Sequence, residues 1–74
     1  MYQPAAGDRI RVTRTPSIHG GTGVMTGIVL DVLTFQGQPG RILDFKCDQG
    51  GHVYLASCEQ MAAMGVTQTI EPAP

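Results

Sequence analysis

Two cysteines and two histidines are the residues of this chain whose side chains bind zinc most commonly. Cys47, His52 and Cys58 are ligand types that zinc prefers, with Asp48 or His19 as the fourth. Zinc sites are usually built on close pairs such as Cys-x-x-Cys, and the sequence contains no such pair. On the predicted hairpin, Cys47 also points inward and His52 outward. We therefore expect no metal and no cofactor, and interpret the cysteines as small apolar residues of the interior.

The same residues could serve nucleophilic catalysis, which needs a cysteine or serine beside a histidine that a third group holds. Cys58 with His52 or His19 provides these residue types without a recognisable spacing. The glycine-rich segment 20–23 lacks the Lys-Ser/Thr pair of a phosphate-binding P-loop, and its last glycine precedes a predicted strand rather than a helix. We predict that the chain is not an enzyme.

Arginines are concentrated near the beginning of the chain. Residues 1–23 contain Arg9, Arg11 and Arg14 against one acidic residue, whereas the remaining residues have an acidic excess. Arginine forms bidentate hydrogen bonds to phosphates and carboxylates, so this patch could bind RNA or DNA, or an acidic protein surface. The alternative is a solvated strand face whose arginines pair with aspartates of the same chain, namely Asp8, Asp31 or Asp44. The formal net charge of −1 argues against a protein whose main task is neutralising phosphates.

A second candidate surface is the outer face of a hairpin predicted for residues 41–56. The side chains expected there are Ile42, Asp44, His52 and Tyr54. Aromatic and aliphatic side chains rimmed by mixed charge are typical of protein interfaces, whereas nucleic-acid grooves interleave stacking aromatics with cations. The same face could instead be covered by the tail of the chain or by a second copy.

The register of this hairpin follows from the alternation of its residues. A three-residue loop over 48–50, with Gly50 in the left-handed conformation, makes the apolar and polar faces agree along both arms. It pairs Cys47 with Gly51, Lys46 with His52, Phe45 with Val53, Asp44 with Tyr54 and Leu43 with Leu55. A four-residue loop would scramble both faces.

Three further strands are predicted. Residues 9–13 and 66–70 alternate apolar and polar positions, as half-buried strands do. Residues 24–35 are apolar on both faces, which predicts a central strand that is bent or bulged at Gly27. Residues 14–23 contain glycines and a proline without periodicity, so we expect a long loop, where binding often occurs.

One short helix is predicted before the last strand. Ser57 and Gln60 have the spacing of a capping box, and Gly65 stands where a left-handed C-terminal cap belongs. Residues 57–64 are therefore expected to form one or two helical turns.

A chain of 74 residues is long enough for one small domain only. We expect this domain over residues 7–70, a flexible N-terminus over residues 1–6 and a disordered tail over residues 71–74. The first residues lack the basic start and apolar run of a secretion signal, and no segment has the length needed to cross a bilayer. A cytoplasmic location without membrane contact is the expectation.

The order of these elements resembles that of the Src-homology-3-like small barrels, with a long loop after the first strand and a helical turn before the last. The segments 7–12, Gly-Asp-Arg-Ile-Arg-Val, and 27–32, Gly-Ile-Val-Leu-Asp-Val, are similar to the two ends of a KOW-type motif. The resemblance implies a mainly β, five-stranded antiparallel barrel that lacks catalytic activity and binds peptides, protein surfaces or RNA. The absence of tryptophan and the few other aromatics argue against proline-rich ligands.

Two functions remain open at this point. The leading hypothesis is an accessory or regulatory binding module that docks on a larger protein through the outer hairpin face and the 14–23 loop, including His19. The second is a KOW-like module that contacts RNA or DNA phosphates through Arg9, Arg11 and Arg14. Binding to phosphates should weaken steeply as salt rises, whereas an interface anchored by Tyr54 should not.

Overall fold

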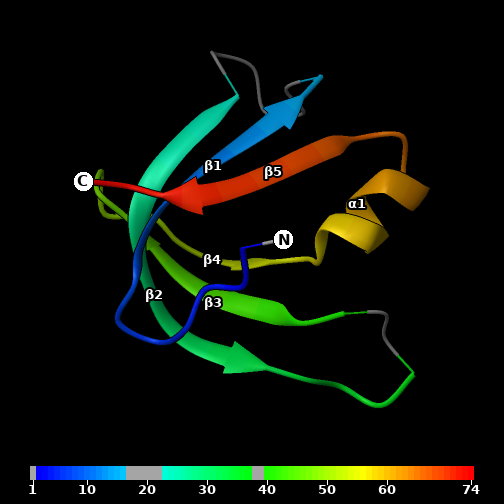
Figure 1. The fold of residues 1–74 in the computed structure, drawn as a ribbon, viewed down its shortest axis with the longest axis horizontal. Helices are drawn as coiled ribbons and strands as arrows, with labels where there is room; N and C mark the ends of the chain where they lie inside the picture. Colours follow the sequence, from blue (N-terminus) through cyan, green and yellow to red (C-terminus); the bar gives the residue numbers. More distant parts are fainter. Residues whose placement is uncertain (1, 17–22, 38–39) are drawn as a thin grey trace.

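The computed structural model describes residues 2–16, 23–37 and 40–74 and contains one antiparallel sheet and one short helix (Figure 1). The elements are β1 (Arg9–Thr15), β2 (Val24–Leu33), β3 (Ile42–Cys47), β4 (His52–Leu55), α1 (Cys58–Ala63) and β5 (Thr67–Pro72). The order in the sheet is β4-β3-β2-β1-β5. This confirms a mainly β fold with five antiparallel strands and a short helix before the last one. Since β4 and β5 are the two edges and are not paired with each other, the sheet is not closed.

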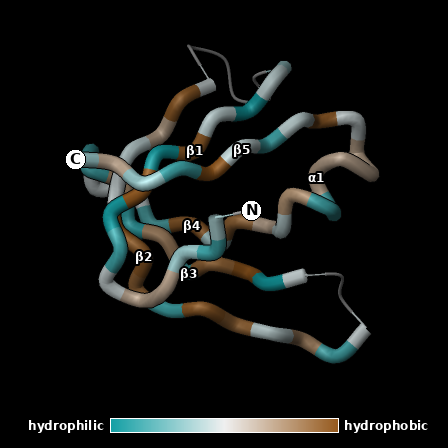
Figure 2. Tube along the Cα trace, viewed as in Figure 1, coloured by the Kyte–Doolittle hydropathy of each residue, from teal (hydrophilic) through white to brown (hydrophobic). Residues whose placement is uncertain are grey.

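The sheet is strongly bent, and its inner face carries the core. The buried side chains of this cluster are Ile10, Val12, Val29, Leu43, Phe45 and Leu55, and none is more than 5% exposed. They alternate with polar positions along β1 and β3, as the sequence predicts, and Figure 2 shows that apolar positions recur on the strands of the sheet.

The central strand β2 is irregular at a different residue from the one predicted. The register between β2 and β3 shifts at Leu30, so this residue, and not Gly27, is the extra residue of a bulge. Gly27 pairs regularly with Cys47 of β3. A Cβ atom at Gly27 would lie 2.1 Å from the carbonyl oxygen of Lys46. Glycine is needed there because the backbone of β3 passes too close to leave room for a side chain.

The β3–β4 hairpin has the predicted three-residue loop and register. Gly50 has a φ of +95°, and its N–H donates to the carbonyl of Cys47 at 2.9 Å. The N–H of Cys47 donates to the carbonyl of Gly51 at 2.7 Å. The cross-strand partners are Lys46 with His52, Phe45 with Val53, Asp44 with Tyr54 and Leu43 with Leu55. The alternation of apolar and polar residues was sufficient to determine this register.

Three strands end two residues away from their predicted ends. β1 continues to Thr15 and includes Arg14, which the sequence assigned to the loop, and β5 ends at Pro72 instead of Ile70. β1 and β5 are paired from Ile10 to Thr15 and from Thr67 to Pro72. The backbone hydrogen bonds between the two strands lengthen both of them, and such bonds leave no local signal in the sequence. β2 ends at Leu33, two residues before the predicted end. Residues 71 and 72 thus belong to the sheet rather than to a disordered tail.

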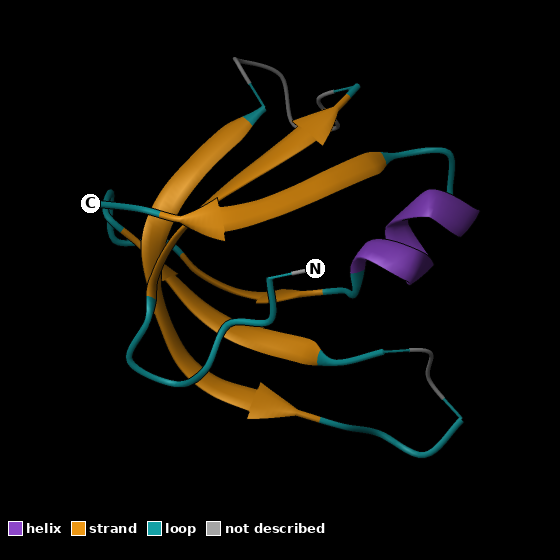
Figure 3. Ribbon diagram, viewed as in Figure 1, coloured by secondary structure: helices purple, strands orange, loops and turns teal. Residues whose placement is uncertain are grey.

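The helix α1 begins and ends as its capping residues predict. The hydroxyl of Ser57 accepts a hydrogen bond from the N–H of Gln60 at 3.1 Å, and Gly65 follows the helix with a φ of +83°. Met61 is the buried residue of the helix. Figure 3 shows α1 at one end of the sheet, where it connects the edge strands β4 and β5.

The segment before β1 is anchored by Asp8. One carboxylate oxygen, Oδ2, accepts hydrogen bonds from the hydroxyl of Tyr2 at 3.0 Å and from the N–H of Ala5 at 2.9 Å. The N–H of Asp8 donates to the carbonyl of Ala5 at 3.0 Å, Pro4 is buried, and Tyr2 packs against the core. These contacts explain why residues 2–8 have a defined path over the sheet.

Candidate protein-docking surface

The outer face of the β3–β4 hairpin brings four of the predicted site residues together. Tyr54 is 65% exposed, and its ring centroid lies 5.9 Å from that of His52. The Nε2 atom of His52 contacts Oδ1 of Asp44, and Ile42 is half-buried on the same face. The contact with Asp44 restrains the imidazole ring, which in turn limits the positions open to the neighbouring Tyr54 ring.

Two aliphatic side chains of β2 extend this surface, and neither is among the site residues predicted from the sequence. Ile28 is 39% exposed and pairs with Lys46 of β3, and Leu30 is 45% exposed. The position of Ile28 follows from its alternation with the buried Val29. The exposure of Leu30 follows from the same alternation, whereas the pairing of the next residue, Asp31, with Asp44 on the outer face depends on the bulge, which the sequence does not reveal. We call the surface formed by Ile28, Leu30, Ile42, Asp44, His52 and Tyr54 the hairpin face.

The remaining predicted binding residues belong to the 14–23 segment. His19 and the other residues from 17 to 22 lie outside the described residues. The N–H of Arg14 donates to the carbonyl of Gly23 at 2.8 Å. The two ends of this segment therefore meet at the end of the β1–β2 ladder.

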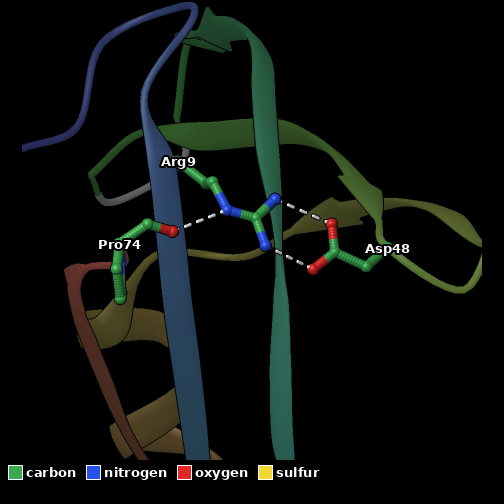
Figure 4. A network of polar contacts seen from close by, with 3 residues as sticks. All are labelled: Arg9, Asp48 and Pro74. Carbon is green, nitrogen blue, oxygen red and sulfur yellow. Dashed lines mark hydrogen bonds and ion pairs between the residues drawn. The ribbon is translucent and has the colours of Figure 1, made fainter.

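Arg9 is held by two partners within the chain (Figure 4). Its Nη1 and Nη2 atoms donate to the two carboxylate oxygens of Asp48 at 2.8 and 2.7 Å, and its Nε atom donates to the carbonyl of Pro74 at 2.9 Å. This bidentate geometry is the one that arginine would offer to a phosphate. Asp48 thus occupies the donors that the nucleic-acid hypothesis needs.

Arg11 and Arg14 also have partners, and they lie on opposite faces of the sheet. The Nε atom of Arg11 donates to Glu71 at 2.8 Å on the exposed face. The Nε atom of Arg14 donates to Oε1 of Gln68 at 2.9 Å, and partial burial lowers the pKa of Arg14. Because Gln68 is only 5% exposed, this bond draws Arg14 toward the interior. The predicted arginine patch is therefore split.

Asp8 and Asp48 make the stability of the fold sensitive to acid. Hydrogen bonds from Ala5 and Tyr2 lower the pKa of Asp8, and hydrogen bonds from Arg9 lower the pKa of Asp48. Each carboxylate therefore stabilises the folded state above its ordinary pKa of 3.8, and this contribution is lost as the pH falls through the lower pKa of the folded state. We expect the melting temperature to fall as the pH drops below the ordinary pKa of 3.8. Asp8→Asn should remove part of this pH dependence, and an unchanged dependence in that variant would contradict the role of Asp8.

The cysteines occupy separate environments. Cys47 packs against the core while His52 lies on the outer face of the same hairpin, and Cys58 lies 3.6 Å from Nε2 of Gln68. Both cysteines are free and partly buried. Within residues 2–16, 23–37 and 40–74, no group of three His, Cys, Asp or Glu side chains could hold a metal ion.

A pocket of about 230 Å³ opens between the N-terminal segment, the start of β3 and the turn before α1. Its walls include Tyr2, Pro4, Leu43, Cys58 and Ile70. No sequence pattern predicts this pocket, because these residues come from distant parts of the chain. Small-molecule sites usually enclose about 300–1,000 Å³, so this pocket is a weaker candidate than the hairpin face.

No protein-family model, no curated protein and no solved structure matches this chain. Among the described residues, no helix has the length and apolar character needed to span a membrane. The hairpin face and the arginines are therefore the features from which a function can be inferred.

Proposed function

We propose that this chain is a non-catalytic accessory or regulatory module that docks on a larger protein through its hairpin face, together with the segment that contains His19. The observation that carries the proposal is the exposure of Tyr54, which leaves 65% of this residue in contact with solvent. Ile28 and Leu30 add apolar area on the same side of the sheet. Burial of such area by a partner is the main driving force of most protein association.

The arrangement of Tyr54 suits an interface anchor. Tyrosine is enriched among the residues that dominate binding energy, because it buries a large apolar ring and has few rotatable bonds. His52 lies beside the ring and is itself held by Asp44, so the Tyr54 ring is restrained on one side before binding. The polar pair of Asp44 and His52 lies at the rim, where it would fix the orientation of a partner bound to the apolar centre.

Nucleic-acid binding through Arg9, Arg11 and Arg14 is the competing proposal. Arg9 and Arg11 would have to exchange the carboxylates of Asp48 and Glu71 for phosphates, so little new electrostatic energy would be gained. Arg14 lies on the other face of β1 and is bonded to a buried side chain. These contacts favour protein docking.

We also infer that the open sheet is a variant of the Src-homology-3-like small barrel with a KOW-type motif. Two hydrogen bonds support this inference, because they join the two segments that carry the resemblance. The N–H of Gly7 donates to the carbonyl of Val29 at 2.7 Å, and the N–H of Val29 donates to the carbonyl of Asp8 at 2.9 Å. The resemblance implies a binding role, in agreement with the proposed docking function.

The test is affinity capture of the tagged chain from its native cell extract, at low and high salt and after nuclease treatment. Tyr54→Ala should reduce recovery of the protein partner by about tenfold or more, since loss of an interface anchor typically costs ~2 kcal/mol. Met64→Ala is the matched control, because Met64 is also 65% exposed but lies outside the hairpin face, after α1. This variant should retain the partner.

The outcomes separate the two proposals. A partner that survives salt and nuclease and is lost only with Tyr54→Ala supports docking through the hairpin face. Recovery that disappears with nuclease or high salt, and with Arg9→Ala combined with Arg11→Ala, would instead establish nucleic-acid binding. Equal capture by Tyr54→Ala and Met64→Ala would refute the hairpin face as the docking site.

A further inference from the structure

β4 is an edge strand whose outward backbone groups have no partner in the described chain. The hydrogen bond from the N–H of Cys47 to the carbonyl of Gly51 makes these residues a hydrogen-bonded pair of the β3–β4 ladder. Such pairs alternate in an antiparallel ladder, so Val53 also bonds to β3, whereas the N–H and C=O groups of His52 and Tyr54 point away from it. No backbone hydrogen bond joins these outward groups to another described residue.

Three of the four side chains of β4, those of His52, Val53 and Tyr54, are also open to solvent, and they lie on both faces of the strand. Val53 points to the inner face opposite Phe45, which is fully buried, yet Val53 is 42% exposed. β4 contains neither proline nor lysine, the residues that commonly protect an edge strand. The other edge strand, β5, contains Pro72, which has no N–H to donate, next to the charged Glu71. Strand pairing is thus favoured at β4.

We propose that β4 of a second copy of this chain pairs with β4 antiparallel across a two-fold axis, so that the two sheets become continuous. In the expected register, His52 faces Tyr54 of the second copy, and Val53 faces its own equivalent on the axis. The outward groups of His52 and Tyr54 then form the hydrogen-bonded pairs, and Val53 forms the pair whose side chains approach most closely. This inference goes beyond the proposed docking function and does not depend on it.

Charge complementarity favours a second copy as the occupant of this edge. Across the outer face, Asp31 faces Asp44, and Asp44 faces Tyr54. In the proposed register the row continues with His52 and Lys46 of the second copy. Each row across the dimer therefore has an acidic half from one copy and a basic half from the other, and the two-fold axis repeats this arrangement.

The neighbouring registers lack this complementarity. Pairing His52 with His52 of the second copy would place the two Lys46 side chains in one row. Pairing Tyr54 with Tyr54 would do the same for the two Asp44 side chains. The register with Val53 on the axis avoids both arrangements and is therefore the one that we expect.

The first experiment measures the mass of the purified chain by sedimentation equilibrium over a range of concentrations. The wild-type chain should reach twice the mass of one chain. Val53→Lys would place two lysines on the axis and should raise the dissociation constant about tenfold or more. Val24→Lys is the matched control, because Val24 is 45% exposed and lies on β2. This variant should dimerise like the wild-type chain.

The second experiment tests the register by cross-linking with oxidised glutathione. Cα atoms of a non-hydrogen-bonded pair lie about 4.5 Å apart, within the range that a disulfide spans. In a background with Cys47→Ala and Cys58→Ala, the Val53→Cys variant should form a covalent dimer. The corresponding Val24→Cys variant should remain a single chain.

Each outcome decides the proposal. A wild-type chain that stays monomeric up to about 1 mM, or a dimer that Val53→Lys leaves unchanged, would overturn pairing through β4. Cross-linking through a cysteine at position 52 or 54 instead of 53 would overturn the register. A monomer that captures its protein partner through Tyr54 would disprove the dimer and leave the docking function intact. A dimer that captures no such partner would disprove the docking function and leave the dimer intact.

Discussion

Phe45→Ala is expected to reduce the free energy of unfolding by about 3–5 kcal/mol. Phe45 is the largest of the fully buried side chains, with an exposed fraction of 0%, and belongs to the cluster that β1, β2, β3 and β4 share. Removing the ring leaves a cavity that a small sheet cannot collapse to fill. A chain of 74 residues has marginal stability, so a loss of this size brings it close to unfolding. Urea denaturation followed by circular dichroism measures the change.

Phe35→Ala provides the matched control, because the same ring is removed from a residue that is 52% exposed and follows the end of β2. We expect a change within about 0.5 kcal/mol. If the two variants lose equal stability, Phe45 does not lie at the centre of the core.

The hairpin and the helix were predicted from the sequence because local signals determine both. Alternation of apolar and polar residues on two arms, joined by a loop with Gly50, permits one register only. The cap at Ser57 and the glycine at position 65 likewise mark the two ends of a helix that is too short to form without them. The same alternation predicts four residues of the hairpin face, namely Ile42, Asp44, His52 and Tyr54.

The partners of the arginines could not be predicted, since they depend on which strands become neighbours. The partners considered from the sequence were Asp8, Asp31 and Asp44. In the structure, Arg11 bonds to Glu71 because β5 lies against β1 and places these residues opposite each other. Arg9 bonds to Asp48, which belongs to the loop after β3. The distribution of charge along the chain therefore suggests that three arginines are available to a ligand, whereas in the structure each of them has a partner.

The bulge in β2 shows a different limit of sequence analysis. Glycine in a strand indicates either a bulge or a close approach of another backbone, and the sequence does not distinguish between the two. In this sheet the bulge lies at Leu30, and Gly27 allows the backbone of β3 to approach β2 closely. This distinction predicts how each position responds to substitution.

Gly27→Ala is accordingly expected to destabilise the fold by about 3 kcal/mol or more, at the upper end of overpacking effects. The added Cβ atom would lie 2.1 Å from the carbonyl oxygen of Lys46 and 2.9 Å from Cα of Cys47. Both are backbone atoms, so no side chain can rotate to relieve the contact, and β2 must separate from β3. Gly51→Ala is the control, because its Cβ atom would lie 3.8 Å from the nearest atom, Cβ of Cys47, which is an ordinary van der Waals distance.

The separation of β2 from β3 has a local readout beside the change in stability. The N–H of Asp48 donates to the carbonyl of Thr26 at 2.9 Å, one residue before Gly27, and this bond should lengthen in Gly27→Ala. Amide hydrogen exchange at Asp48 should then become faster, while exchange in the β1–β5 ladder should accelerate only as far as the loss of global stability requires. Since Asp48 also holds Arg9, the same substitution should release that guanidinium. Unchanged exchange at Asp48 in a destabilised Gly27→Ala variant would show that the added methyl group is accommodated elsewhere than between β2 and β3.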